Sequence, residues 1–568
     1  MNKKTIIRTF EKIALYMELL GENPFKVGAF RKAANVLELD PRSLSEMDDI
    51  LKLKGIGKGT GAVIIDLLEK GESDLLKELE HEVPKGLLPL LKVPGLGGKR
   101  IAKLRETLGI DSVESLRQAC ELNKVSELPG FGKKTEEKLL HELQQLGTRK
   151  EKLPVWQIES IVHAIEEELR RIPEITRFSV AGSFRRAEEM SSDVDFIIVT
   201  DNPAVVREKV VSALPVEETV AAGDAKLSIV LDMTDAVDVD FRFVTDEQFA
   251  TALHHFTGSK DHNVKMRQLA KSKGMKISEY GVEQEDGTTK TFSSEKAFFK
   301  FFDLPYIPPS VRTNGTEIDR ADEIAELVTV QDIRGDFHMH TTWSDGGYSI
   351  REMAEACRAK GYTHMVITDH THYLKVANGL TPERVREQIA EIRKVNAEFD
   401  DIEIFCGTEM DILPDGTLDF EDDLLQELDF VIASIHSNFN QSQEQIMERL
   451  YAAMKNPYVH MIAHPTGRII GQREGYNPDV MQLIEWAKEH HKILELNGNP
   501  HRFDLCTEYL VAAQEAGVKI AINTDAHAID QLNYMDIAVN YAQKAWLKKE
   551  TVVNTWPLEQ FIREIIRK

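Results

Sequence analysis

The chain has 568 residues, which is too long for one hydrophobic core, so we expect about three to five domains. Its 42% apolar and 29% charged residues are ordinary for a globular protein, and neither a secretion signal nor an 18-residue apolar run is found. The four scattered cysteines form no CxxC pair, which argues against a disulfide framework or cysteine zinc site and favours a reducing cytoplasm.

The net charge of −24 hides an uneven distribution along the chain. Residues 1–150 carry 26 Lys and Arg against 23 Asp and Glu, a net charge of +3, whereas the remainder carries 44 against 71. The acidity therefore belongs to the later domains, and the first part remains suited to contacting phosphates.

Residues 1–150 are predicted to be helical. They contain one short pattern three times, in which an apolar segment is followed by Gly-apolar-Gly and then by cations at the start of a helix. Gly-x-Gly directs backbone N–H groups outward at a helix start, which suits phosphate binding. One copy is equally well explained by a tight turn between helices, but three favour binding to the DNA backbone. The glycines and lysines concerned are Gly55, Gly57, Lys58, Gly95, Gly97, Lys99, Gly130, Gly132 and Lys133.

Residues 151–245 alternate helix and strands, and one predicted strand begins with Asp193 and Asp195. Residues two apart on a strand face the same side, so these carboxylates converge. A later strand, "AVDVDFRFV", offers Asp240, with Asp238 as its competitor. Three carboxylates suit two Mg²⁺ or Mn²⁺ ions, which activate a hydroxyl and stabilise a leaving pyrophosphate. An exposed strand edge explains D-x-D alone equally well.

A glycine-serine pair eleven residues before the first aspartate strengthens this interpretation. Gly182 and Ser183 precede Arg185 and Arg186 and supply amides, a hydroxyl and cations for a triphosphate. The combined spacing favours nucleotidyl transfer.

From residue 333 onward, strands and helices alternate, and twelve of the 18 histidines lie in this part. Seven apolar runs each end in a metal-ligand type, as in a βα barrel, so we predict a distorted seven-stranded barrel with a metal site at the strand ends. Two histidines, His338 and His340, share a strand face and suit Zn²⁺, Mn²⁺ or Fe²⁺. The histidines expected to be structural are His364, His460, His490, His491 and His501.

"GSFRR", "DVD", "VDFR" and "HFTGSKDHNVKMR" together resemble family X DNA polymerases over roughly residues 1–316. The resemblance implies that Asp193, Asp195 and Asp240 bind two metal ions during catalysis. It also implies that Ser183 and Arg186 hold the triphosphate and that Phe256, Gly258 and Ser259 line the sugar pocket. Asn263 and Arg267 would lie near the base pair and the template. Lys26, Arg31 and Lys58 would hold a 5′-phosphate.

Two departures from that family's pattern have consequences. His255 stands where the family commonly has tyrosine, which puts discrimination against ribonucleotides in question. The helix "GTGAVIIDLL" contains no lysine for a Schiff base, so we predict no 5′-deoxyribose-phosphate lyase activity of that kind.

"HMHTTWSDGG", "TDH", "SIH", "AHPTGR" and "TDAH" together resemble the PHP domain over residues 333–568. The resemblance implies up to three Mn²⁺, Zn²⁺ or Fe²⁺ ions, with His372 and Asp336 nearby, and 3′→5′ exonuclease action with abasic-site endonuclease activity as a further expectation. The implied ligand sets are His338, His340, Glu409 and Asp525; Glu409, His436 and His464; and Asp345, His370 and His527.

The predicted protein is a multidomain, cytoplasmic, monomeric repair enzyme that acts on gapped or nicked DNA with deoxynucleoside triphosphates. Two alternatives remain: a small-molecule phosphatase with a vestigial polymerase, and a non-catalytic DNA-end scaffold. The predicted domains are a DNA-end-binding domain at 1–80, helix-hairpin-helix fingers at 81–150, an α+β nucleotidyltransferase palm at 151–245, a thumb at 246–316, a linker at 317–332 and the PHP barrel at 333–568.

Overall fold

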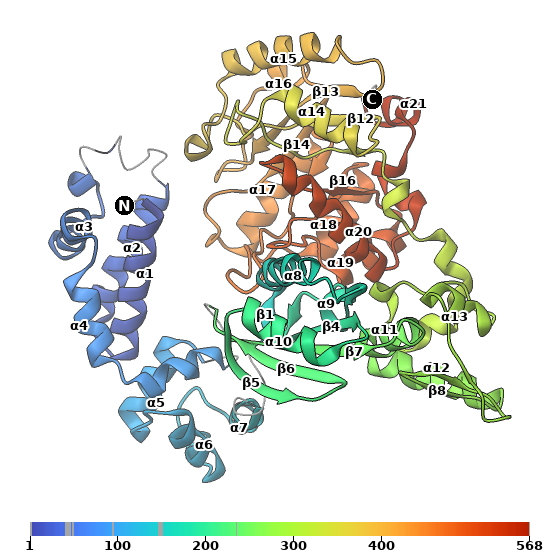
Figure 1. Ribbon diagram of the computed structural model, residues 1–568. Helices are drawn as coiled ribbons and strands as arrows, with labels where there is room; N and C mark the ends of the chain where they lie inside the picture. The colour runs from blue at the N-terminus through green and yellow to red at the C-terminus, as the bar shows by residue number, and fades with distance from the viewer. Residues whose placement is uncertain are drawn as a thin grey trace. The chain divides into compact units, whose positions relative to one another are not determined.

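The computed structural model describes residues 3–39, 47, 50–93, 96–145, 152–233 and 236–566 (Figure 1). The chain divides into two compact units, Met1–Glu151 and Lys152–Lys568, which are described separately. Among the described residues, no helix combines the length and apolar character that crossing a membrane requires.

The first unit is helical, as its apolar spacing predicts. Ile6, Phe10, Ile13 and Met17 are buried along one face of the first helix, at the three- and four-residue spacing of an amphipathic helix. The helices are α1 (Lys3–Leu19), α2 (Pro24–Leu39), α3 (Lys58–Lys70), α4 (Asp74–Glu82), α5 (Gly98–Leu108), α6 (Val113–Glu121) and α7 (Lys133–Gln145), with 3₁₀ turns η2 (Ile50–Lys52) and η3 (Lys85–Lys92).

The second unit begins with a five-stranded sheet, the palm sheet, in the order β2-β4-β7-β6-β5. β4 and β7 are parallel, and the other neighbouring pairs are antiparallel. The elements are β1 (Leu153–Pro154), α8 (Val155–Arg170), β2 (Arg177–Val180), α9 (Gly182–Arg185), β3 (Met190–Ser191), β4 (Asp193–Val199), α10 (Pro203–Ala213), β5 (Val216–Ala222), β6 (Lys226–Leu231) and β7 (Val237–Val244).

A smaller helical segment follows the palm sheet and has its own aromatic core, which includes Phe298, Phe299 and Phe302. A buried ion pair joins Arg312 Nη1 to Glu295 Oε1 at 2.7 Å and fixes the end of this segment. Its elements are α11 (Phe249–Thr257), α12 (Lys260–Ser272), β8 (Lys276–Ser278), β9 (Gly281–Glu283), β10 (Thr289–Lys290) and α13 (Glu295–Phe301), followed by 3₁₀ turns η4 (Pro309–Val311), η5 (Thr316–Ile318), η6 (Ala321–Glu326) and η7 (Val330–Asp332).

The remaining residues form a parallel seven-stranded sheet, called here the barrel, in sequential order from β11 to β17. Its ends nearly close, because a parallel bridge joins Met339, after β11, to Ala526, after β17. The strands are β11 (Gly335–Asp336), β12 (His364–Ile367), β13 (Glu403–Asp411), β14 (Phe430–Ser434), β15 (Met461–Ile462), β16 (Ile493–Asn497) and β17 (Ile520–Asn523).

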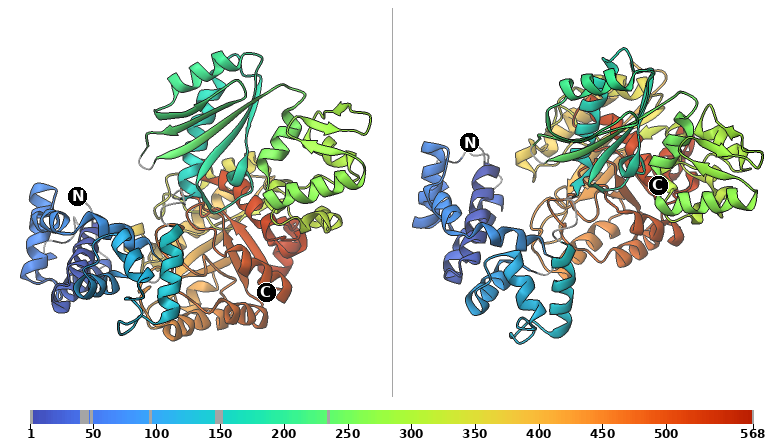
Figure 2. Two further views of the ribbon diagram at one scale, coloured as in Figure 1. Left: turned by 90° about the horizontal axis from the view of Figure 1, so that it is seen from below. Right: turned by 60° about the horizontal axis from the view of Figure 1, so that its bottom comes forward.

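Helices on the outside of the barrel connect successive strands (Figures 1 and 2). They are α14 (Ile350–Ala359), α15 (Pro382–Asn396), α16 (Asp422–Leu425), α17 (Gln443–Lys455), α18 (Val480–Glu489) and α19 (Thr507–Ala516). After the last strand come α20 (Tyr534–Lys544) and α21 (Leu558–Phe561). The domain also contains 3₁₀ turns η8 (Lys375–Ala377), η9 (Ile529–Asn533), η10 (Lys549–Thr551) and η11 (Val553–Thr555), and a π-helical turn (Ile562–Ile566).

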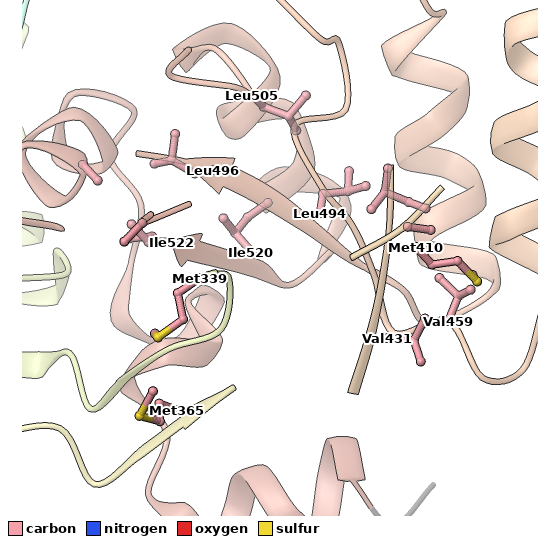
Figure 3. Close-up of a cluster of buried hydrophobic side chains, with 14 of the residues drawn as sticks. Met339, Met365, Met410, Val431, Val459, Leu494, Leu496, Leu505, Ile520 and Ile522 are labelled. Carbon is pink, nitrogen blue, oxygen red and sulfur yellow. The ribbon is translucent and has the colours of Figure 1, made fainter. Parts of the chain in front are cut away.

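Alternation along each strand separates the inside of the barrel from the helix-covered outside. On β16 and β17, Leu494, Leu496, Ile520 and Ile522 belong to the large outer core (Figure 3), whereas Ile493 belongs to a separate inner cluster. That inner cluster is apolar and includes the ring of Phe561 stacked on Phe337, with centroids 4.5 Å apart.

Candidate active sites

The first candidate site lies on the two parallel central strands of the palm sheet. Their register sets Asp195 opposite Asp240 and Asp193 opposite Asp238, so these carboxylates leave one face of the sheet. Asp193 and Asp240 are among the charges that act most strongly on the pKa of Asp195. The structure therefore places the three sequence-predicted aspartates on one face of the sheet, with Asp238 beside Asp193 on the same face.

The electrostatics of this group leave negative charge uncompensated. Burial and the charges of Asp193 and Asp240 raise the pKa of Asp195 to about 7. Burial also acts to raise the pKa of Asp240, but hydrogen bonds from Lys226 Nζ, at 2.8 Å, and Ser228 Oγ, at 2.6 Å, hold it below its usual value. A divalent cation would supply the missing positive charge, so these oxygens fit Mg²⁺ or Mn²⁺.

Position 182 requires glycine because the backbone there passes very close to Asp195. Its φ is +65°, and a Cβ atom there would lie 2.2 Å from Oδ2 of Asp195. The next residue, Ser183, lies within hydrogen-bond distance of the Ser191 hydroxyl. Arg186 Nη1 donates to the carbonyl oxygen of Thr257 at 2.6 Å, which ties the glycine-serine turn to α11.

The predicted nucleotide-pocket residues lie around the end of α11. The Arg242 guanidinium lies 4.7 Å from the ring centroid of Phe256, and Asn263 Nδ2 donates to the carbonyl oxygen of His255 at 2.7 Å. Gly258 has a φ of +71° and ends the helix, while Arg267 is exposed on α12. These contacts fix the pocket backbone and leave the side chain of Arg267 at the surface.

The predicted DNA-binding cations of the first unit lie at helix starts. Lys58, Lys99 and Lys133 are exposed in the first turns of α3, α5 and α7. Gly55 and Gly130, with φ of +125° and +90°, form two of the preceding turns. Gly57 and Gly97 are the N-caps of α3 and α5, Gly132 directly precedes α7, and Gly95 lies outside the described residues.

Two of the three cations predicted to hold a 5′-phosphate are exposed on α2 and paired with glutamates. Lys26 Nζ lies 3.0 Å from Glu22 Oε2, and Arg31 Nη2 lies 2.9 Å from Glu18 Oε2. A phosphate would have to compete with these carboxylates.

The second candidate site lies at the carboxyl ends of the barrel strands. Three groups of side chains each place one ligand atom per residue within 4.8 Å of the others. The groups are His338, His340, Glu409 and Asp525; His340, Asp345, His370 and His527; and His370, Glu409 and His436.

The first group is the set that the PHP resemblance implies for one ion, and the other two share most of their members with the remaining sets. His464 joins through Nε2, which lies 2.8 Å from Glu409 Oε1, and His436 Nε2 lies 3.2 Å from the same oxygen. Nε2 of His338 and Nδ1 of His370 are buried without a hydrogen-bond partner among the described residues, yet lie 3.2 and 3.1 Å from Glu409 Oε2. Such unpartnered nitrogens fit metal ligation.

The strand β11 is shorter than predicted, so His338 and His340 lie just beyond its end.

Two other ligand candidates, His464 and Asp525, have φ of +29° and +55°, in the left-handed region that non-glycine residues rarely adopt. Strain of this kind is found at functional sites, where surrounding bonds enforce it.

Buried carboxylates orient the imidazoles from behind. Glu495 Oε1 lies 2.7 Å from His338 Nδ1, and Glu495 Oε2 accepts from the backbone N–H of His464 at 2.7 Å. Asp411 Oδ1 likewise lies 3.1 Å from His436 Nδ1. Each carboxylate fixes which ring nitrogen is left for a metal ion.

Sequence reasoning placed Glu495 among the ligand types that end apolar runs, but it assigned neither Glu495 nor Asp411 a supporting role. The signal was present, because Glu495 lies two residues after the inward-facing Ile493, and Asp411 lies two residues after Glu409. Of the two supporting residues proposed from sequence, Asp336 is buried and accepts from Thr524 Oγ1 at 2.6 Å, whereas His372 is exposed. His364 and His460, expected to be structural, stack on Phe337 and Phe430.

Acidic groups in the barrel raise the pKa of two neighbouring imidazoles. Although burial opposes it, Asp411 and Glu409 raise the pKa of His436 to about 10. Burial likewise opposes the effect of Asp345 and Asp525, which raise the pKa of His527 to about 9. The site is thus built to hold positive charge where metal ions would bind.

Comparisons with known proteins match this architecture part by part. Residues 1–73 match a helix-hairpin-helix domain, 87–145 a SAM-like helix-hairpin-helix tandem, 252–313 the DNA polymerase beta thumb and 336–499 the PHP domain. A protein described as DNA polymerase/3′-5′ exonuclease PolX, from Bacillus subtilis (strain 168), is 55% identical over 560 residues, 98% of each chain. This chain belongs to the PolX family.

Family membership confirms the predicted resemblance to family X polymerases with a PHP domain, and the predicted fold class. The barrel by itself is also similar to smaller proteins described as probable phosphatases. One from Thermoanaerobacter sp. (strain X514) is 29% identical over 41% of this chain and 96% of its own, and one from Acetivibrio thermocellus is 30% identical over 41% and 95%.

Asp195→Asn is expected to stabilise the metal-free palm sheet at pH 8. A folded pKa of about 7, against an unfolded value of about 4, costs up to about 4 kcal/mol once the group is ionised. Because this pKa is raised, stability is lost as pH rises through that window, so the advantage of the variant should shrink at pH 5 and disappear near pH 4. Hydrogen exchange of β4 and β7 amides in EDTA measures it.

The matched control is Asp201→Asn, which removes the same charge from an exposed position. An advantage for Asp195→Asn that is equal at pH 5 and pH 8 would contradict the electrostatic account.

Glu495→Gln is expected to weaken divalent-metal binding by the barrel about 10- to 100-fold, because the neutral amide no longer fixes the His338 ring as strongly. Competition with a chromogenic chelator measures the affinity. Glu403→Gln, at the amino end of β13 and six residues before Glu409, is the control and should bind metal as the wild type does. Unchanged affinity in Glu495→Gln would remove this carboxylate from the site.

Proposed function

We propose that this chain is a DNA polymerase that fills short gaps during repair and carries a separate 3′→5′ exonuclease in its barrel. The observation that carries the proposal is that one chain combines three aspartates on paired palm strands with histidine-carboxylate groups in the barrel, within a match that spans nearly all of the PolX relative.

In the palm, Asp193, Asp195 and Asp240 would hold two Mg²⁺ or Mn²⁺ ions, which lower the pKa of a primer hydroxyl and neutralise a leaving pyrophosphate. The protein's own contribution is positioning. Gly182 leaves room beside Asp195, while Ser183 and Arg186 offer a hydroxyl and a guanidinium to the triphosphate.

In the barrel, the three histidine-carboxylate groups would hold up to three Mn²⁺, Zn²⁺ or Fe²⁺ ions, which supply hydroxide near neutral pH and polarise a phosphodiester. Glu495 and Asp411 keep the imidazoles oriented, and the apolar cluster around Phe561 closes the opposite end of the barrel. Substrate would therefore enter from the carboxyl ends of the strands. The same chemistry extends our proposal to cleavage at abasic sites.

Paired substitutions separate the two reactions. Asp193→Ala with Asp195→Ala should lower primer extension about 1000-fold or more, because about 4 kcal/mol of metal-dependent stabilisation is lost, and should leave 3′ digestion intact. His338→Ala should have the reverse effect. Extension and digestion of one labelled gapped duplex report both.

The phosphatase similarity of the barrel keeps one alternative open, a small-molecule phosphatase. It predicts that wild-type protein hydrolyses phosphomonoesters and neither extends nor digests DNA. If the aspartate double variant and His338→Ala each abolished both DNA reactions, the assignment of two independent sites would be wrong.

The first unit is proposed to bind the 5′ side of a gap without lyase chemistry. No lysine lies between Lys58 and Lys70, the two ends of α3, so borohydride should trap no covalent adduct between this helix and a 5′-deoxyribose phosphate. Lys58→Gln should weaken binding to a 5′-phosphorylated gap more than to an unphosphorylated one, measured by fluorescence anisotropy. An adduct mapped to α3 would overturn the prediction.

A further inference from the structure

The turn that carries the triphosphate-binding candidates ends in two glutamates that bond to the barrel. Glu189 Oε1 and Oε2 lie 2.8 and 3.2 Å from Nη2 and Nη1 of Arg468, and the hydroxyl of Tyr541 donates to Glu189 Oε1. Lys544 Nζ lies 2.7 Å from Glu188 Oε2. Both carboxylates of this palm segment are therefore held by barrel side chains.

On the barrel side, Arg468 connects two loops of the metal site. It lies four residues after His464, and its Nε donates to the carbonyl oxygen of Arg502 at 2.9 Å. The Arg502 side chain in turn places Nε 3.6 Å from Oδ2 of Asp525, a candidate metal ligand. The Arg468 fork also donates to the carbonyl oxygen of Phe503.

On the palm side, the glutamates close the turn that Ser183 begins. The backbone N–H groups of Arg186 and Glu188 both donate to the carbonyl oxygen of Ser183, at 3.1 and 3.2 Å. The carbonyl oxygen of Glu189 accepts from the Val155 N–H at 2.8 Å, which attaches the turn to α8. A displacement of Glu189 would therefore be transmitted to Ser183 and Arg186.

A stacked ring pair supports the same interface. Trp156 stacks on His501 with centroids 4.5 Å apart and 17° between the planes, and its Nε1 donates to the carbonyl oxygen of Ile470 at 3.2 Å. His501 directly precedes Arg502, so the same barrel loop is held from the palm at two points.

We propose that the Glu189–Arg468 pair is a positioning element shared by both reactions. Arg468, on the barrel, positions the nucleotide-binding turn of the polymerase site, and Glu189, on the palm, positions the His464 and Arg502 loops of the nuclease site. This inference rests on the proposed function.

The arrangement differs from an ordinary contact between domains in what each partner touches. Arg468 and Glu189 have side chains only 19% and 29% exposed, so their bidentate pairing is partly withdrawn from water and geometrically specific. Each partner is also within a few residues of groups assigned to the reaction of its own domain. The pair therefore joins two catalytic loops rather than two remote surfaces.

The test measures each substitution in the reaction of the other domain, in full-length protein. Glu189→Gln should lower kcat/KM for 3′ digestion, without nucleotides present, about 5-fold or more. Arg468→Gln should raise KM for deoxynucleoside triphosphate by a similar factor, with extension assayed in a His340→Ala background that silences the nuclease. Arg468→Lys, which keeps the charge and loses the fork, should be intermediate.

Glu174→Gln, which breaks the palm surface pair with Lys209, is the control and should change neither value. The double variant Glu189→Gln with Arg468→Gln should show less than the product of the two single effects. Tyr541→Phe, a mild change at the same carboxylate, should shift both reactions in the same direction by a smaller factor.

Lower unfolding midpoints with both cross-domain kinetic values unchanged would make the pair structural only and overturn the inference. If Glu189→Gln proves too unstable to assay, an unchanged Tyr541→Phe has the same meaning. If neither wild-type protein nor Glu174→Gln extended a primer or digested a 3′ end, the proposed function would instead be refuted.

Discussion

Burying acidic side chains that lack a permanent cation is the constraint on which both candidate sites depend. In the barrel, imidazoles lie beside the acids, and Asp411 and Glu409 raise the pKa of His436 to about 10 although burial opposes this. In the palm, less of the negative charge is compensated. Lys226 and Ser228 bond to Asp240, whereas burial and the neighbouring carboxylates raise the pKa of Asp195 to about 7. The two sites therefore compensate buried negative charge in different ways, the barrel with imidazoles and the palm with one lysine and one hydroxyl.

Side-chain alternation along the strands is enough to bring the acidic and imidazole groups of each site together. Along β16, the inward positions change from Ile493 to Glu495 and then Asn497, so one strand contributes first to the apolar inner cluster and then to the metal site. The apolar end anchors the barrel through Phe561, which leaves the polar end free to be shaped for charge rather than for packing. In the palm, the parallel pairing of β4 and β7 places the aspartates of the two strands on one face of the sheet.

Much of this arrangement was predictable from sequence because parallel strands bring distant residues to one edge. The ligand-type side chains after seven apolar runs and the D-x-D strand needed only that rule and strand alternation. The register that sets Asp240 opposite Asp195, and the pairing of Asp240 with Lys226, depend on contacts that no local pattern encodes. The partnership of Glu495 with His338 joins residues 157 positions apart, and the clash that makes Gly182 necessary depends on the exact approach of α9 to β4.

Backbone strain links the domain interface to the barrel site. His464 and Phe503, with φ of +29° and +39°, occupy conformations that persist only when neighbouring bonds enforce them. Those bonds come from Asp504, which accepts from the N–H groups of Thr466 and Gly467, and from Arg468, whose guanidinium is shared between Phe503 and Glu189 of the palm. A metal ligand held in a strained conformation partly by another domain is sensitive to that domain's position. The palm is therefore part of the structure that shapes the nuclease site.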